Sequence, residues 1–277
     1  MKLPRNSNIV VCGIARDVEG DLSFEVRRLL RSLKEFKSIA FVVVESFSQD
    51  KTRDVLVQLQ KDIASFKFES ISHSSNLTCT RSERLAEARN ASLQIQKSAF
   101  PDADYVYMTD LDGVNRDLSL RAVMSCWNYP EWDVMTSNQP LGYYDILALR
   151  HDYWCQDNWG EAFEELIKYF PKETAAYIAL KSKSISISRE NPLIPVKSAF
   201  GGGAIYTFES INNKSYNGLD KQGKEVCEHV PLNLSIHDSG GKLYINPALV
   251  NVRSLGRSHS LKKRLKRRLS HFRGQVG

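Results

Sequence analysis

Residues 105–113 read Tyr-Val-Tyr-Met-Thr-Asp-Leu-Asp-Gly. The aromatic and β-branched residues at the start of this stretch are typical of a buried strand. Asp110 and Asp112 are two positions apart, so on an extended backbone their side chains point to the same side. Gly113 allows the chain to turn sharply after them. Carboxylates in this pattern suit Mg²⁺ or Mn²⁺, ions that bind diphosphates. The alternative is a loop whose aspartates cap the next helix.

Length and composition describe an ordinary globular protein. The chain has 277 residues, of which 42% are hydrophobic and 25% charged, enough for one large α/β domain or two small ones. No apolar run is long enough to span a bilayer, and the first six residues lack the apolar core of a signal peptide. Five scattered cysteines predict free thiols in a reducing compartment rather than disulfides or a zinc site. We therefore expect a cytoplasmic location.

The basic character of the chain belongs to its C-terminal end. Nine of the 38 Lys and Arg residues lie in residues 253–274, which contain no Asp or Glu. The rest of the chain therefore carries 29 basic and 32 acidic residues. A body with this balance does not predict nucleic-acid binding.

Strands and helices alternate over the first 71 residues. Apolar runs predict strands at 8–15, 39–45 and 66–71, and amphipathic patterns predict helices at 24–36 and 52–64. This order indicates a nucleotide-binding half-sheet of parallel strands. No G-x-G-x-x-G or P-loop lysine motif is present, which disfavours the usual dinucleotide and ATP sites.

Charged residues follow these strands in positions that suit a ligand. Arg16 and Glu45 stand at the carboxyl ends of the first two strands, where open α/β sheets bind ligands. Arg16 fits a phosphate contact or a solvated loop equally well. A predicted helix over residues 81–93 then carries Arg81, Arg84 and Arg89, which could bind a diphosphate by bidentate contacts. Its glutamates are equally compatible with a surface helix stabilised by ion pairs.

The second half of the chain predicts a mixture of elements. We expect helices at 118–127, 161–169 and 172–183, strands at 132–137, 143–150, 185–189 and 243–247, and a helix that begins near 227. Three glycines at 201–203 precede a further apolar strand. Glycines there allow either a close approach of the backbone to a ligand or a flexible turn.

In this order and spacing the motifs resemble the glycosyltransferases of the GT-A fold. The similarity is greatest to the capsule-associated α-1,3-mannosyltransferases and their bacterial relatives. Four stretches carry it, at 84–90 (RLAEARN), 110–112 (DLD), 200–203 (FGGG), and 227–229 (CEH) together with 244–247 (YINP). The chain departs from the family at Phe200, where a tryptophan is usual, and at His229, where an acid is usual.

The resemblance implies an α/β protein with a GT-A-like, Rossmann-type mixed sheet flanked by helices over residues 1–252. It implies a hexosyltransferase that moves a sugar such as mannose from a GDP- or UDP-linked donor to a glycan or lipid-linked acceptor in surface polysaccharide synthesis. Asp110 and Asp112 would hold Mn²⁺ or Mg²⁺ on the donor diphosphate, as a Lewis acid for the leaving group.

The resemblance also implies roles for the remaining candidate residues. Arg16 and Glu45 would lie at the nucleoside, and the three arginines of residues 81–89 near the phosphates. Glu228, together with Asp112, is the predicted catalytic residue, and His229 is a predicted metal ligand. Glu228 or His229 would act near the acceptor hydroxyl or complete the metal shell. A helix start with a surface imidazole is the simpler interpretation of this Glu-His pair.

Two other function classes compete with the transferase. A nucleotidyltransferase can share the sheet and the metal carboxylates, but it normally has a glycine cluster after the first strand, which residues 15–20 (ARDVEG) lack. A non-catalytic basic adaptor at the membrane is disfavoured by the acidic body and the intact Asp-x-Asp.

The tail at 253–277 predicts a basic amphipathic helix. Leu261, Leu265 and Leu269 recur every four residues, and six Lys and Arg residues fill positions 262–268 around them. Anionic lipid attracts such a segment by about 1 kcal/mol per basic residue. We expect peripheral binding at the inner face of the membrane; a solvated disordered tail and nucleic-acid binding are the alternatives.

Overall fold

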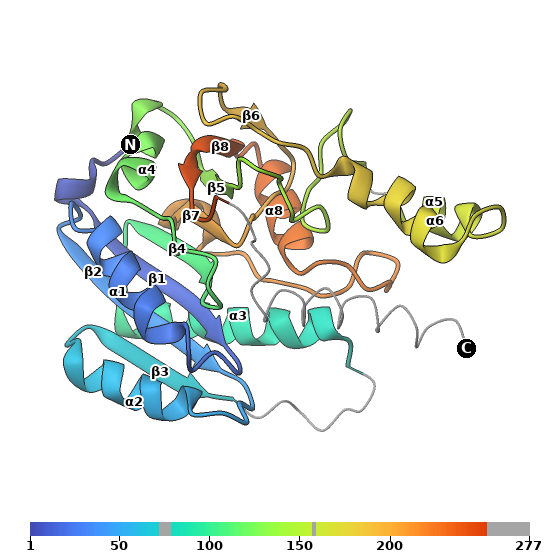
Figure 1. Ribbon diagram of the computed structural model, residues 1–277. Helices are drawn as coiled ribbons and strands as arrows, with labels where there is room; N and C mark the ends of the chain where they lie inside the picture. Colours follow the sequence, from blue (N-terminus) through green and yellow to red (C-terminus); the bar gives the residue numbers. More distant parts are fainter. Residues whose placement is uncertain (72–78, 157–158, 254–277) are drawn as a thin grey trace.

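The computed structural model describes residues 1–71, 79–156 and 159–253. Its centre is a mixed eight-stranded sheet in the order β3-β2-β1-β4-β7-β5-β8-β6 (Figure 1). The strands are β1 (Asn8–Ala15), β2 (Ser38–Glu45), β3 (Phe66–Ser70), β4 (Tyr105–Asp110), β5 (Val134–Asn138), β6 (Ile194–Pro195), β7 (Gly203–Thr207) and β8 (Leu243–Val250).

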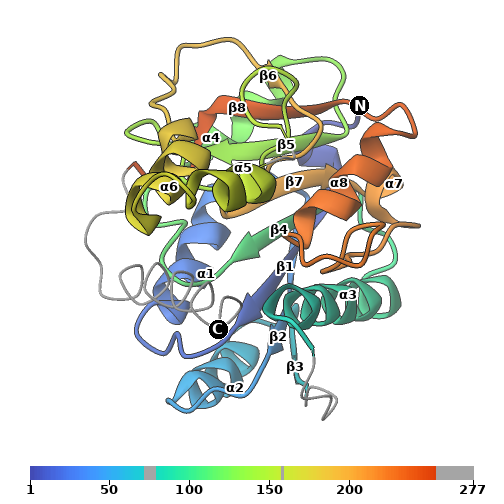
Figure 2. The same cartoon turned by 90° about the vertical axis from the view of Figure 1, so that its right-hand side faces the viewer.

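Helices cover both faces of this sheet. They are α1 (Leu22–Ser32), α2 (Thr52–Asp62), α3 (Arg81–Ala99), α4 (Leu120–Met124), α5 (Trp159–Leu166), α6 (Lys172–Ala179), α7 (Phe208–Ile211) and α8 (His229–His237), with short 3-10 helices at Pro4–Asn6, Ser125–Asn128 and Lys181–Lys183. Alternate residues of β1 face opposite ways: Ile9 and Val11 pack in the cluster that contains α1 and α2, whereas Val10 and Cys12 pack in the cluster that contains α3 and α8. Figure 2 shows the sheet between these layers.

The predicted parallel half-sheet is confirmed. β1 pairs in parallel with β2 and β4, and β2 with β3. β7 then runs antiparallel between β4 and β5, which makes the sheet mixed as expected. The register sets Ile14 opposite Asp110 and Ala15 opposite Glu45. The carboxyl ends of β1, β2 and β4 therefore meet at one edge of the sheet.

Two predicted strands are wrong. Residues 143–150 form turns that make a single β-bridge, from Arg150 to Ser198, and residues 185–189 form no strand. Most of their apolar side chains are at least partly buried without a neighbouring strand: Tyr143 is fully buried and Ile187 nearly so, whereas Ile185 is exposed. Their backbone groups bond individually, as when the Ile187 carbonyl accepts from the Asn138 side chain. Apolar periodicity reports burial, and here burial occurs in irregular chain.

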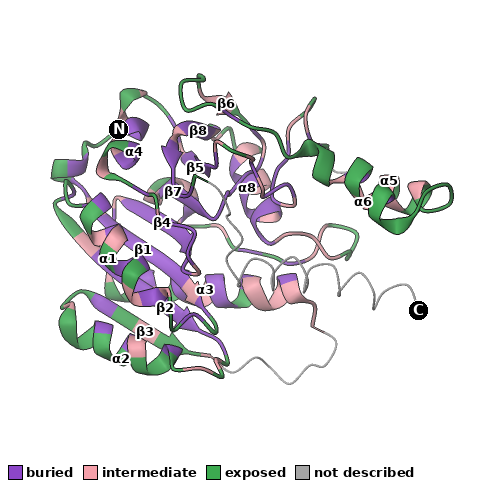
Figure 3. Cartoon of the chain, viewed as in Figure 1, coloured by how far each residue is buried: buried purple, intermediate pink, exposed green. Residues whose placement is uncertain are grey.

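Several predicted boundaries shift by a few residues, and α3 continues to Ala99 because its buried face extends to Gln96. The buried residues follow the strands, whereas α5 and α6 are largely exposed (Figure 3). Among the described residues no helix is long and apolar enough to cross a bilayer. The predicted helix of the C-terminal tail lies outside the described residues, apart from Arg253.

Candidate active site

Asp110 stands at the end of β4, in the middle of the sheet. Its backbone N–H donates to the carbonyl of Gly202 (3.0 Å), and the neighbouring Thr109 hydroxyl donates to the same oxygen (3.0 Å). The residues that precede β7 therefore hold the end of β4 from the antiparallel side. Asp112 follows in the next turn and is half-buried. The sequence placed both carboxylates at a strand end, and the structure agrees.

The glycine stretch before β7 is a tight turn against protein, not an open loop. Gly201 and Gly202 have φ angles of 67° and 81°, which glycine adopts without strain. A Cβ on Gly201 would lie 2.4 Å from the Ser137 carbonyl oxygen, too close for any side chain. The Gly201 N–H donates to the Asp145 carboxylate (3.1 Å). The sequence left two alternatives for these glycines, a close approach of the backbone to a ligand or a turn, and the structure contains a turn.

Arg89 connects three distant parts of the chain. Its guanidinium donates from Nη2 to Oδ1 of Asp110 (2.8 Å) and from Nε to Oε1 of Glu228 (2.9 Å). It also lies over the ring of Phe200, with 5.0 Å from Cζ to the ring centroid. The Arg89 side chain is only 3% exposed. Burial alone would lower the pKa of Arg89, but Asp110 and Glu228 raise it above its usual value, so the group stays charged.

Glu228 and His229 lie at the start of α8. Burial works to raise the pKa of Glu228, but nearby positive charge and the Arg89 hydrogen bond outweigh it, and the pKa is lowered. The positive charge that lowers the pKa of Glu228 is that of Arg89 and not that of His229. Burial and the same arginine lower the pKa of His229 to about 3, which leaves the imidazole neutral at neutral pH. His229 stacks on Phe200, with ring centroids 3.6 Å apart, and is not the surface imidazole of the simpler interpretation.

The balance of charges around Asp110 is compatible with a bound cation. One positive group, Arg89, bonds the carboxylates of Asp110 and Glu228, and Asp112 follows Asp110 by two positions. Among the described residues no group of three or more His, Cys, Asp or Glu side chains is arranged to hold a metal ion. A hard divalent cation can nevertheless be held by one or two carboxylates together with substrate phosphates and water. Asp110 and Asp112 fit that mode of binding, whereas His229 does not form a three-ligand cluster with them.

A buried polar network beneath this loop was missed by the sequence analysis. Glu25 accepts from the backbone N–H (2.9 Å) and side-chain amide (2.8 Å) of Asn115. The same amide donates to the Asp110 carbonyl (3.0 Å), so Glu25 holds the Asp-x-Asp turn indirectly. Burial raises the pKa of Glu25 to about 7, and the charges of Asp112 and Asp21 add to the increase. A carboxylate on the apolar face of α1 was the available signal.

The loops after β1 and β2 support each other at the same edge. Arg16 is about half exposed, and its Nε lies 3.8 Å from Asp17. Asp17 and Phe47 both have positive φ, which is uncommon for residues with a side chain. Glu45 is buried and accepts from the Ser48 N–H at 2.6 Å. Arg16 is therefore open to a ligand, whereas Glu45 shapes the loop that follows it.

The three arginines of α3 do not point to one place. Arg84 donates to the Cys79 carbonyl, Arg81 opens the helix, and Arg89 is buried eight positions later.

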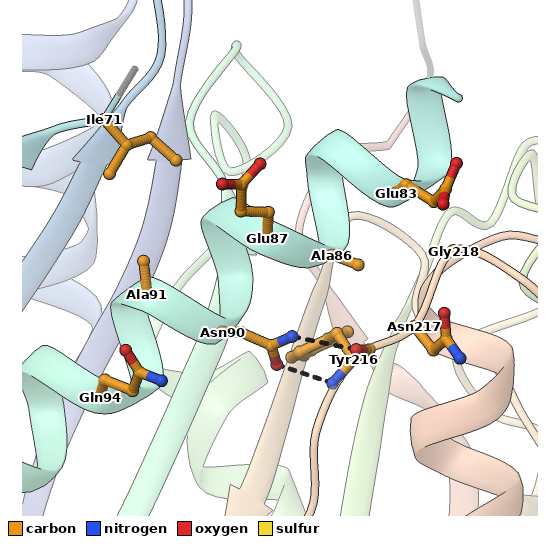
Figure 4. Close-up of a pocket in the computed structure, with 10 residues that line it drawn as sticks. All are labelled: Ile71, Glu83, Ala86, Glu87, Asn90, Ala91, Gln94, Tyr216, Asn217 and Gly218. Carbon is orange, nitrogen blue, oxygen red and sulfur yellow. Dashed lines mark hydrogen bonds between the residues drawn. The ribbon is translucent and has the colours of Figure 1, made fainter. Parts of the chain in front are cut away.

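Beside α3 lies a cavity of about 490 Å³ (Figure 4). Asn90 fastens one wall of it, because its side chain accepts from the Tyr216 N–H (2.8 Å) and donates to the Tyr216 carbonyl (3.0 Å). The cavity is lined by carboxylate, amide and small apolar groups: Ile71, Glu83, Ala86, Glu87, Asn90, Ala91, Gln94, Tyr216, Asn217 and Gly218. Such groups bind hydroxyls more readily than phosphates.

No family model and no curated protein matches the chain. Among solved structures, the mannosyltransferase PcManGT from Pyrobaculum calidifontis, in complex with GDP-Man and Mn²⁺, is similar with a TM-score of 0.50 and 13% identity, over 91% of this chain and 58% of that one. S. aureus TarS 1–349 follows with a TM-score of 0.47 and 10% identity over 86% and 57% of the two chains, and its complex with UDP-GlcNAc with 0.49 and 10% over 86% and 55%.

This chain therefore spans 55–58% of the length of these three solved structures. At 13% identity the likeness to the mannosyltransferase concerns the fold alone. It confirms the expected fold class, a mixed α/β sheet flanked by helices.

Proposed function

We propose that this chain is a metal-dependent glycosyltransferase that takes a sugar from a nucleotide-sugar donor. The observation that carries the proposal is the pair Asp110 and Asp112 at the central strand end, next to the buried Arg89–Glu228 pair, in a fold shared with a mannosyltransferase. Carboxylates beside the carboxyl ends of parallel strands are placed where such sheets bind nucleotides.

The proposed roles follow from burial and contact. Asp110 and Asp112 would hold Mn²⁺ or Mg²⁺, which would supply Lewis-acid stabilisation of the leaving nucleoside diphosphate. Arg16, half exposed at the same edge, contacts the donor directly. Arg89 already bonds two carboxylates, so it positions Asp110. Glu228 is 6% exposed and bonded to Arg89, so we assign it a positioning role through that residue.

Three candidate residues remain. Arg81 and Arg84 are proposed to contact the donor phosphates from the start of α3, and Glu45 to shape the nucleoside loop. The donor is GDP- or UDP-linked, and the acceptor is a glycan or lipid-linked sugar of surface polysaccharide synthesis. The cavity of Figure 4, with its hydroxyl-binding lining, suits a sugar or ribose group.

The test is release of nucleoside diphosphate from a panel of GDP- and UDP-sugars, with EDTA and then with Mn²⁺ added back. We expect release from at least one donor, loss with EDTA, and loss in the Asp110→Asn and Asp112→Asn variants. Asp102→Asn is the matched control, because Asp102 is exposed and precedes the opposite end of β4. Pyrophosphate release from a sugar phosphate and a nucleoside triphosphate, with no turnover of any nucleotide sugar, would establish the nucleotidyltransferase instead.

We further propose that the basic tail brings the enzyme to an anionic membrane at the cytoplasmic face. Its six clustered Lys and Arg residues at 262–268 support this through attraction to anionic headgroups. The full chain should sediment with anionic liposomes more completely at low salt than at high salt, because salt screens the attraction of the tail. A chain ending at residue 253 should lose this additional sedimentation at low salt and keep donor binding; an unchanged salt dependence contradicts the proposal.

A further inference from the structure

Helices α5 and α6 form a hairpin that projects from the body of the protein (Figures 1 and 2). α5 contains no buried residue, although it carries Trp159 and Phe163. α6 buries only Ala175 and Ala179. The hairpin therefore adds little to the core, and a structural role in the sheet does not explain its apolar side chains.

The exposed apolar residues concentrate at the tip of the hairpin. Every residue of 167–174 is exposed, and this stretch begins Ile-Lys-Tyr-Phe-Pro-Lys. Tyr169 is 71% and Phe170 44% exposed, and Tyr177 on α6 is 58% exposed. Figure 3 shows the exposure of this hairpin. Clustered apolar exposure of this kind is unusual on a soluble surface and marks an interaction site.

The charged residues of the hairpin are unevenly distributed, and the basic part favours an anionic partner. The root, residues 159–166, carries three Glu and no Lys or Arg. The remainder, residues 167–183, carries four Lys and one Glu. Aromatic rings that alternate with lysines suit the bilayer interface, where the rings sit at headgroup depth and the ammonium groups reach the phosphates.

We infer that the tip of the α5–α6 hairpin inserts into a lipid surface, with Tyr169 and Phe170 in the interface and Lys168 and Lys172 on the headgroup phosphates. The contact is independent of the basic tail, because it depends on apolar insertion and not on charge alone. It also differs from the proposed catalytic function, since none of its residues belongs to the candidate active site.

The first test uses the full chain and vesicles of phosphatidylcholine with phosphatidylglycerol at about 0.5 M NaCl, where attraction between exposed charges is screened. The wild type should still bind. The Tyr169→Ser/Phe170→Ser variant should bind at least about tenfold more weakly, because two aromatic side chains are no longer buried in lipid. Phe24→Ser is the control: Phe24 is 47% exposed on α1, and its loss should leave binding unchanged. Circular dichroism verifies that each variant is folded.

A second measurement locates the tip directly. Tyr169→Trp should be quenched by brominated lipid, and Tyr153→Trp, at a 96% exposed tyrosine outside the hairpin, should not be. Equal binding by the wild type and the double serine variant, or equal quenching at both positions, overturns the inference. So does complete loss of wild-type binding at high salt. A lipid-free dimer that the double variant abolishes, without any difference in vesicle binding, would assign the tip to a second copy of the chain instead.

Discussion

Replacing Arg89 with methionine removes the one positive group between two buried carboxylates. Asp110 and Glu228 would lose hydrogen bonds of 2.8 and 2.9 Å and face each other without a counter-charge. Breaking a buried ion pair by removing one partner costs about 3–5 kcal/mol of stability, because the remaining charge stays desolvated. We therefore expect the free energy of unfolding of Arg89→Met to fall by about that amount at neutral pH.

The dependence on pH distinguishes this electrostatic loss from a packing defect. In the wild type the pKa of Glu228 is lowered in the folded state, so its contribution to stability is present above its unfolded value and is lost as the pH falls through the folded one. Without Arg89, burial raises the pKa of Glu228 in the folded variant. Protonation of Glu228 at lower pH then removes its buried charge and reduces the loss of stability. The stability gap between wild type and Arg89→Met should therefore narrow as the pH falls from about 8 to about 5.

Urea unfolding followed by circular dichroism measures both quantities. Leu93→Ala is the matched control, because Leu93 is buried on the same helix one turn later and its loss costs about 2–5 kcal/mol by cavity formation. That cost should not change with pH. A loss below about 1 kcal/mol for Arg89→Met, or a gap as constant with pH as that of the control, would refute the reasoning.

Three further predictions concern the turn, the buried carboxylate and the thiols. Gly201→Ala should destabilise the protein by more than Gly223→Ala in thermal melts, since both have positive φ but only Gly201 would place a Cβ against a backbone carbonyl; equal losses would contradict this. Glu25→Gln should stabilise the protein at about pH 8 and remove the decline in stability between about pH 4.3 and 7, because the raised folded pKa means that stability is lost as the pH rises through that range. Of the five cysteines, Cys79 and Cys227 alone should react quickly with a thiol reagent in the native state, because the other three are buried; rapid labelling of more than two would oppose the described packing.

The parallel half-sheet was predictable because its strands are buried on both faces. Such strands appear as continuous apolar runs, as at 39–45. β1, β2 and β3 also pair in the order in which they follow along the chain, whereas β4 returns to pair with β1. The insertion of β7 between β4 and β5 could not be seen in this way, because it joins segments about a hundred residues apart. The apolar run at 143–150 shows the converse, since its side chains are buried without any strand.

The candidate site likewise contains residues that the sequence predicted and contacts that it could not predict. Asp110 and Asp112 were found because a strand that ends in two carboxylates is a local pattern. The bond from Arg89 to Glu228 joins residues 139 positions apart, and only the folded chain shows that this arginine is buried between carboxylates. Local sequence placed Arg89 correctly on a helix, but it could not distinguish a ligand contact from an internal ion pair.

The proposed function requires that Asp110 and Asp112 form a metal-dependent site for a nucleotide sugar. Isothermal titration of the full chain with GDP- and UDP-sugars, with and without Mn²⁺, tests it most directly. We expect binding of at least one donor that requires Mn²⁺ in the wild type, persists in Asp102→Asn, and is lost in Asp110→Asn and Asp112→Asn. Absence of binding to every donor, or Mn²⁺-dependent binding that survives in both active-site variants, would contradict it.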